Sequence, residues 1–155
     1  MAKPAKHYRP EDTTTVTPYL TVKGGAQAIE FYKKAFGAEE RQRMAGPDGL
    51  IMHATLRIGD STVYLCDEMM GSKSPKTLGG SPVMLHMYLP DADAAWKQAV
   101  AAGAKVTQPL ADQFWGDRFG LVEDPFGHFW AISTQKEDLT PAEMEERAKA
   151  AMQKG

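Results

Sequence analysis

The side chains of this chain that could do chemistry are chiefly four histidines, five tyrosines and one cysteine. His53 and His86 each stand in a stretch where apolar and polar residues alternate, which is typical of a strand with two different faces. An imidazole can bind a metal, transfer a proton near neutral pH or hydrogen-bond to a neighbour. His128 instead follows the tight turn of DPFGHFWAIST and precedes the apolar Trp130, which favours a structural place for it.

Cys66 is the only cysteine, so the chain offers neither an intrachain disulfide nor a thiolate zinc cluster, and we expect a buried structural thiol. Of the residues, 43% are apolar, and 18 Lys and Arg nearly balance 20 Asp and Glu. This composition is typical of a globular protein and gives no reason to expect a nucleic acid or an anionic membrane as a partner. The chain shows no secretory signal and no run of roughly eighteen apolar residues, so we expect a cytoplasmic protein.

Helices and strands must position these side chains, and the first half of the chain predicts one order of them. Alternation marks a strand over 16–22, and apolar residues at helical spacing mark a helix over about 25–36, ended by Gly37. Turn sequences then separate three further strands, near 38–44, 50–58 and 61–67.

The second half repeats this order. A strand over 83–89 precedes a helix over about 91–102, and strands follow near 105–109, 117–123 and 127–134. The boundaries FGA, at 36–38, and AGA, at 102–104, are 66 residues apart. The simplest explanation is a duplicated β-α-β-β-β unit, which predicts an α+β fold with a curved mixed sheet around a cleft between the two units.

Three segments follow from this pattern. Residues 1–14 are polar and non-periodic, which predicts a flexible N-terminal arm. Residues 15–136 form the domain, with units at about 15–68 and 81–135. Residues 137–155 contain Thr140-Pro141-Ala142-Glu143, a capping box that predicts a C-terminal helix with an apolar stripe.

Each strand should turn an apolar face to the helices and its other face to the cleft. Val16, Met52 and Trp130 are therefore expected on covered faces, together with Leu20 and Val22. By the same rule, the residues expected to line the cleft are Tyr19, His53, Arg57, Tyr64, Met84, His86 and Tyr88.

The loop ADQFWGDRFG, at 111–120, adds two candidates for ligand binding. Trp115 lies next to Gly116, outside any amphipathic pattern, so it could cover the cleft or pack on the sheet of its own hairpin. Arg118 could bind an anionic or carbonyl oxygen through its two-pronged donor group, or form an ion pair with Asp112 or Asp117.

The duplicated unit, the helices AIEFYKKAFGA and DADAAWKQAVAAGA, and the DPFGH turn together resemble the vicinal oxygen chelate superfamily, the glyoxalase and bleomycin-resistance group. Within it, the stretches DQFWGDR, DPFGHFW and EDLTPAEM are similar to those of PhnB-like members. The resemblance covers about residues 16–147, and it implies a small-molecule site and a homodimer.

Metal-dependent members of that superfamily carry ligands at four cleft positions. The resemblance places these positions at Thr17 and Met84 on the first strands, and at Tyr64 and Ala131 on the last strands. These residues do not make the His and Glu set that divalent first-row metals or zinc prefer, so we expect no metal and no cofactor. A displaced site at His53 and His86 would need a carboxylate that this face does not clearly offer.

Three functions remain open from the sequence. The first is a metal-free protein that binds an amphipathic, partly aromatic small molecule. The second is a lyase-, isomerase- or dioxygenase-like enzyme with an atypical site, or a metal-free acid-base catalyst that uses His86. The third is a homodimeric interaction module with a vestigial cleft.

Overall fold

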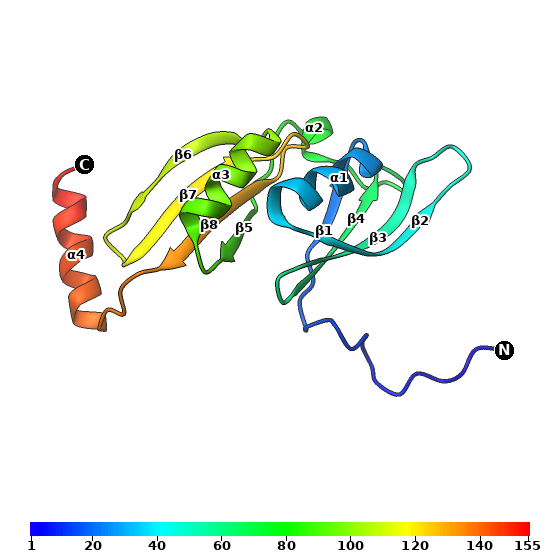
Figure 1. The fold of residues 1–155 in the computed structure, drawn as a ribbon, viewed down its shortest axis with the longest axis horizontal. Coiled ribbons are helices and arrows are strands. Elements are labelled where there is room, and N and C mark those ends of the chain that lie inside the picture. Colours follow the sequence, from blue (N-terminus) through cyan, green and yellow to red (C-terminus); the bar gives the residue numbers. More distant parts are fainter. The chain divides into compact units, whose positions relative to one another are not determined.

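The computed structural model describes residues 1–155 and divides into two compact units, residues 1–78 (unit 1) and 79–155 (unit 2). Each unit holds one four-stranded mixed sheet and one long helix that precedes its second strand (Figure 1). The elements of unit 1 are β1 (Tyr19–Val22), α1 (Gly25–Phe36), β2 (Glu39–Ala45), β3 (Ile51–Ile58), β4 (Ser61–Asp67) and the short α2 (Pro75–Leu78). Those of unit 2 are β5 (Met84–Tyr88), α3 (Ala92–Ala102), β6 (Lys105–Asp112), β7 (Asp117–Glu123), β8 (Phe129–Gln135) and α4 (Pro141–Gln153). Two tandem βαβββ units with a C-terminal helix are therefore confirmed.

Unit 1 has the strand order β1-β4-β3-β2, in which β1 runs parallel to β4 and the other neighbours are antiparallel. Helix α1 covers one face of this sheet (Figure 1). Ile29 and Tyr32 of the helix are fully buried with Leu56 and Leu65 of the sheet. The other face carries no helix of unit 1, and we call it the open face of unit 1.

Unit 2 repeats the order as β5-β8-β7-β6, with β5 parallel to β8. Helix α3 covers one face, and the other is the open face of unit 2 (Figure 1). Gly120 allows the helix to approach, because a Cβ at this position would collide with the Trp96 ring. Helix α3 buries fully only Ala92 and Ala99, so Leu85 of β5 stays half-buried.

The strand registers give the duplication an offset of 67 residues. Tyr19 pairs with Tyr64 in unit 1, and His86 pairs with Ala131 in unit 2. The helix caps agree: the Asp67 carboxylate accepts from the backbone N–H of Gly25, and the Thr134 hydroxyl accepts from that of Ala92. A side chain at the end of the fourth strand thus anchors the helix N-terminus in both units.

Two covered-face predictions are wrong. Val16 is 80% exposed, because β1 begins only at Tyr19. Met52 is 48% exposed and Ile51 is buried in its place. A register shift between Met44 and Ala45 of the partner strand β2 accompanies this break in alternation.

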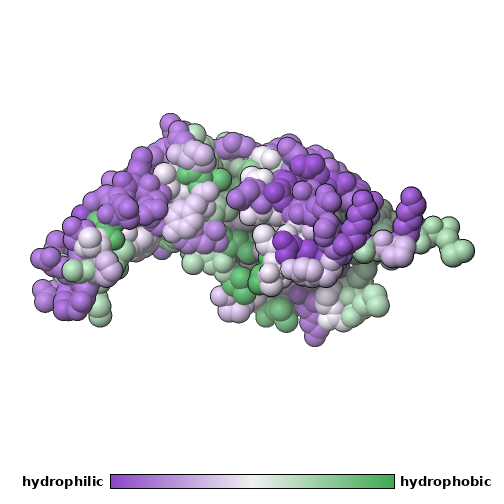
Figure 2. All heavy atoms as spheres, turned by 90° about the horizontal axis from the view of Figure 1, so that it is seen from below, coloured by the Kyte–Doolittle hydropathy of each residue, from purple (hydrophilic) through white to green (hydrophobic).

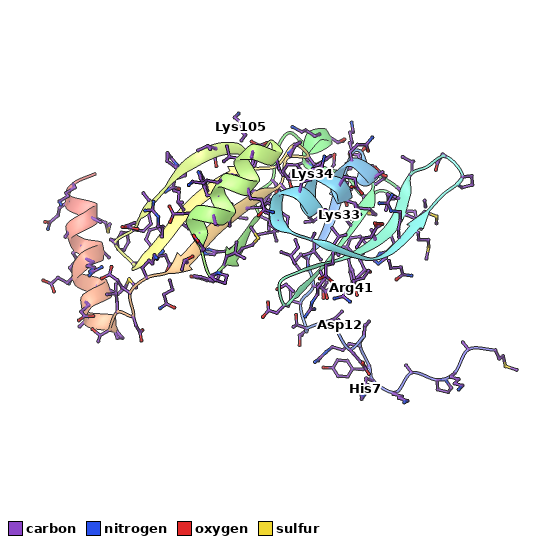
Figure 3. The ribbon with its side chains drawn as sticks, in the orientation of Figure 1. His7, Asp12, Lys33, Lys34, Arg41 and Lys105 are labelled. Atoms are coloured by element: carbon purple, nitrogen blue, oxygen red, sulfur yellow. The ribbon has the colours of Figure 1, made fainter.

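The N-terminal arm meets unit 1 at Asp12 and Thr13, as Figure 3 shows for Asp12. The carbonyl oxygen of Asp12 accepts hydrogen bonds from Arg57 Nη1 at 2.7 Å and from the Thr62 hydroxyl. Thr13 is 8% exposed. The end of the arm is therefore fixed on β3 and β4, where the sequence predicts flexibility up to residue 14.

The DPFGH turn is built on Asp124, which is 2% exposed. Its Oδ1 accepts from the backbone N–H of Phe126 at 2.8 Å and of His128 at 3.0 Å. Its Oδ2 accepts from Trp130 Nε1 at 2.8 Å, and Trp130 is 2% exposed as predicted. The backbone of His128 is therefore part of a turn that these structural hydrogen bonds hold together.

Helix α4 begins with the predicted capping box, in which the side chains of Thr140 and Glu143 each bond the other's backbone N–H. None of its residues is buried, and Met152 is 81% exposed. A fork of two 2.8 Å contacts between Arg147 and Glu137 ties the helix to its linker. No helix of the chain has both the length and the apolar character needed to cross a membrane.

Candidate functional site

The open face of unit 1 carries a cluster of three rings from Tyr19, His53 and Tyr64, all predicted to line the cleft. Their centroids lie 4.9–5.5 Å apart. The Tyr19 hydroxyl is 2.7 Å from His53 Nδ1, and His53 Nε2 is 3.1 Å from the Thr55 hydroxyl. Strands β1, β3 and β4 each supply one ring, and these strands are neighbours in the sheet, so the sheet order brings the three rings together.

Tyr19 is 51% exposed, yet its surroundings still affect its proton. Partial burial raises the pKa of the Tyr19 phenol, and the neighbouring thiol of Cys66 raises it further. Cys66 itself is 8% exposed, as expected for a structural thiol. Tyr19 therefore presents a protonated hydroxyl next to an imidazole.

Arg57 lies on the open face of unit 1, in register with Thr62. One of its amino groups binds the Asp12 carbonyl oxygen and the Thr62 hydroxyl, at 2.7 and 3.1 Å. Some of the N–H donors of Arg57 are therefore already used in a hydrogen bond to the N-terminal arm.

The open face of unit 2 carries Met84, His86 and Tyr88 from β5, which the sequence predicts to line the cleft. The His86 and Tyr88 rings stack with centroids 4.7 Å apart and planes at 25°. His86 Nε2 lies 2.9 Å from the hydroxyl of Ser133, which is fully buried. Met84 and Tyr88 are 45% and 64% exposed, so this edge of the face is open to solvent.

Asp117 fixes two of these aromatic side chains. Its Oδ2 accepts hydrogen bonds from the Tyr88 hydroxyl and from Trp115 Nε1, each at 3.0 Å. Asp117 is only 5% exposed, and its hydrogen bond raises the pKa of the Tyr88 phenol. Trp115 also packs edge-on against Phe119 at 5.4 Å, so it belongs to the sheet surface of its own hairpin.

Arg118 lies on the opposite face of the β7 strand. Its guanidinium contacts the carboxylates of Asp93 on α3 and Asp112 on β6, at 2.9 and 3.0 Å. These two contacts, first that with Asp93, raise the pKa of Arg118 further. The ion pair with Asp112 is one of the two roles the sequence allows, and we leave Arg118 out of the proposed site.

The four positions that the resemblance assigns to metal ligands are Thr17, Tyr64, Met84 and Ala131. Tyr64 and Ala131 occupy matching positions, since the registers pair them with Tyr19 and His86. Ala131 is fully buried and offers no donor atom. The structure gathers no group of three or more His, Cys, Asp or Glu side chains that could hold a metal ion. The donor set at these positions does not fit the His and Glu ligands of a divalent first-row metal.

Comparisons with known proteins identify the family. A family model described as the Glyoxalase/Bleomycin resistance protein/Dioxygenase superfamily matches residues 12–132. The chain therefore belongs to this superfamily, which confirms the prediction from its motifs.

Relatives support the same assignment. Uncharacterized protein Rv0887c of Mycobacterium tuberculosis is 46% identical over 135 residues, which is 84% of this chain and 79% of the relative. The solved structure of the Arabidopsis thaliana gene product At5g48480 is 32% identical, with a TM-score of 0.64 over 76% of this chain and 96% of its own. A Bacillus cereus structure described as a PhnB protein and putative 3-demethylubiquinone-9 3-methyltransferase is 16% identical. It has a TM-score of 0.58 over 78% of this chain and 99% of its own, and it shares the fold.

Sequence reasoning missed Asp117 as a part of this face. Asp117, Phe119 and Leu121 alternate along β7 and pair with β8 at Gln135, Ser133 and Ala131. This alternation was the available signal, because it puts a carboxylate on the same face as two apolar residues. The sequence also did not identify Ser133 as the partner of His86.

Proposed function

We propose that this chain binds a small, partly aromatic molecule on its open sheet faces and uses no metal ion to do so. One observation carries the proposal: His86, Tyr88 and Trp115 form an accessible aromatic surface, held in place by the buried Ser133 and Asp117. Rings with fixed orientation lose little conformational entropy when a ligand stacks on them. Unit 1 supplies a second surface of this type at Tyr19, His53 and Tyr64.

The donor chemistry of the superfamily ligand positions supports the metal-free part of this proposal. Thr17, Tyr64, Met84 and Ala131 provide two hydroxyls, a thioether and a methyl group. Two aromatic clusters stand on the faces where metal-dependent members would place their ligands. Stacking and hydrogen bonding are therefore the interactions that these faces can offer.

An unbiased ligand screen by thermal shift tests the proposal. A compound at 100 times its dissociation constant should add about 2.7 kcal/mol to the free energy of unfolding. Hits should be lost in Tyr88→Ala and Trp115→Ala, and retained in Tyr8→Ala, which removes a ring that is 88% exposed on the N-terminal arm. Hits that survive both site variants and also survive Tyr19→Ala would contradict binding on these faces.

A second candidate function is acid-base catalysis by His86. It is supported by the 2.9 Å contact with Ser133, which orients the ring through Nε2. A hemithioacetal of methylglyoxal with a thiol is a suitable test compound. Turnover that follows a histidine titration and disappears in His86→Gln would favour the enzyme, and no turnover would favour the binding protein.

A homodimer belongs to the same proposal. Helix α4 supports it, because Met144, Ala148 and Ala151 are only half-buried and Met152 is exposed. A single helix with an uncovered apolar stripe gains stability when a second surface covers it.

A further inference from the structure

The open face of unit 2 combines aromatic rings with a buried negative charge. His86 stacks on Tyr88 and is tilted against Phe119 at 5.6 Å, while Trp115 meets Phe119 edge-on. We call these four side chains the ring cluster. Tyr88 forms its exposed side and Phe119, at 6% exposure, its floor.

Asp117 lies at the polar end of two of these rings. One oxygen of its carboxylate, Oδ2, accepts a hydrogen bond from the Tyr88 hydroxyl and another from the Trp115 indole N–H. A ring whose N–H or O–H donates to a carboxylate gains electron density, and the negative potential over its face becomes stronger. The two donors therefore make the ring cluster more attractive to a positive charge than isolated rings would be.

The two arginines of unit 2 are paired with other carboxylates. Arg118 is paired with Asp93 and Asp112 on the helix-covered face, and Arg147 is paired with Glu137. No ion pair joins Asp117 to a lysine or an arginine. Asp117 therefore has two neutral hydrogen-bond donors and no ion pair.

A surface depression of about 360 Å³ adjoins this carboxylate. Its lining residues are Asp112, Gln113, Gly116, Asp117, Lys136 and Glu137. Asp112 and Glu137 are already paired with Arg118 and Arg147, and Lys136 is the one basic residue of the lining, so Asp117 is the carboxylate here that takes part in no ion pair.

Building on the proposed function, we infer that the open face of unit 2 selects a cationic ligand, an alkylated ammonium group that rests on the ring cluster. An alkylated ammonium is large, weakly hydrated and matched to an aromatic face, whereas a carboxylate ligand would be repelled by Asp117. The apolar part of such a ligand would contact Met84 beside the rings.

Choline and 3,3-dimethylbutan-1-ol test this inference, because they have the same shape and differ in charge. Binding is measured by isothermal titration calorimetry and by shifts of the Trp115 indole N–H resonance. We expect choline to bind at least about fivefold more tightly than the neutral alcohol. Asp117→Asn should reduce this preference to less than about twofold, and the matched control Asp138→Asn, at an exposed carboxylate, should preserve it.

Tyr88→Phe is a second variant, which tests the same contact in case Asp117→Asn does not fold. It keeps the ring and removes only the hydroxyl that donates to the Asp117 carboxylate. This variant should weaken choline binding while leaving the neutral alcohol unchanged. Equal binding of the two probes to the wild-type chain would overturn the inference. If neutral aromatic hits from the thermal-shift screen bind this face and choline does not, the inference fails and the proposed function stands. If neither binds, both fail.

Discussion

Replacing Asp124 by alanine should destabilise unit 2 more than other single changes at polar residues. The carboxylate accepts three hydrogen bonds at 2.8–3.0 Å, from two backbone N–H groups and from the indole of Trp130. The residue and the indole are each 2% exposed, so water cannot easily replace the lost acceptor. An unsatisfied buried donor costs about 1–3 kcal/mol. Allowing for relaxation of the turn, Asp124→Ala should lower the free energy of unfolding by about 3–5 kcal/mol.

Asp124→Asn separates charge and geometry. The amide oxygen can still accept from Phe126 and His128, but the amide nitrogen must then face the Trp130 N–H. We expect a loss of about 1.5–3 kcal/mol, between that of the alanine variant and the wild type. Asp138→Ala, at an exposed carboxylate of the same unit, should change stability by less than about 0.5 kcal/mol.

Urea unfolding followed by tryptophan fluorescence and circular dichroism measures all three variants. Trp130 reports on the turn directly, and the circular dichroism follows the sheet. A loss below about 1 kcal/mol for Asp124→Ala would mean that the three contacts to Asp124 contribute little to the stability of unit 2.

Three further predictions follow from the structure. The Tyr88 phenol should titrate above its ordinary pKa of 10.0 in ultraviolet difference spectra, because its phenolate would face Asp117, and Asp117→Asn should lower that pKa. The pKa of Glu68 is lowered from 4.5 to about 2 by hydrogen bonds from Thr77 and Ser74. Its stabilising effect is therefore complete above about pH 4.5 and is lost as the pH falls toward 2, and Glu68→Gln should remove this acid sensitivity of α2 in amide exchange. Deleting residues 139–155 should leave both sheets folded, since α4 has no buried residue, and should convert a homodimer to a monomer in sedimentation velocity; an unchanged mass would exclude α4 from the dimer contact.

Much of the fold could be predicted because its signals are local and periodic. Alternation located the strands, Gly37 and the AGA boundary at 102–104 marked the two helix ends, and the repeat of these signals revealed the duplication. The errors arise where a strand pairs irregularly or begins late. Met44 pairs with His53 and Ala45 with Ile51, which leaves Met52 as an extra, exposed residue on β3, and such a bulge depends on how β3 pairs with β2.

The sequence could predict which sheet face each residue of the candidate site lies on, but it could not predict which side chains that residue contacts. Period-two alternation placed Tyr19, His53, His86 and Tyr88 on the open faces, since side-chain direction follows from position along a strand. Their partners depend on the pairing of distant strands. Asp117 reaches Tyr88 only because β7 and β5 flank β8, and this adjacency is a property of the sheet order.

Ligand binding after exhaustive chelation tests the central proposal most directly. The compound that gives the largest thermal shift is titrated into protein treated with EDTA, and again after Zn²⁺, Mn²⁺ or Ni²⁺ has been added. We expect the same dissociation constant in every case and loss of binding in Trp115→Ala. Binding that disappears on chelation and returns with one equivalent of metal would contradict metal-free binding.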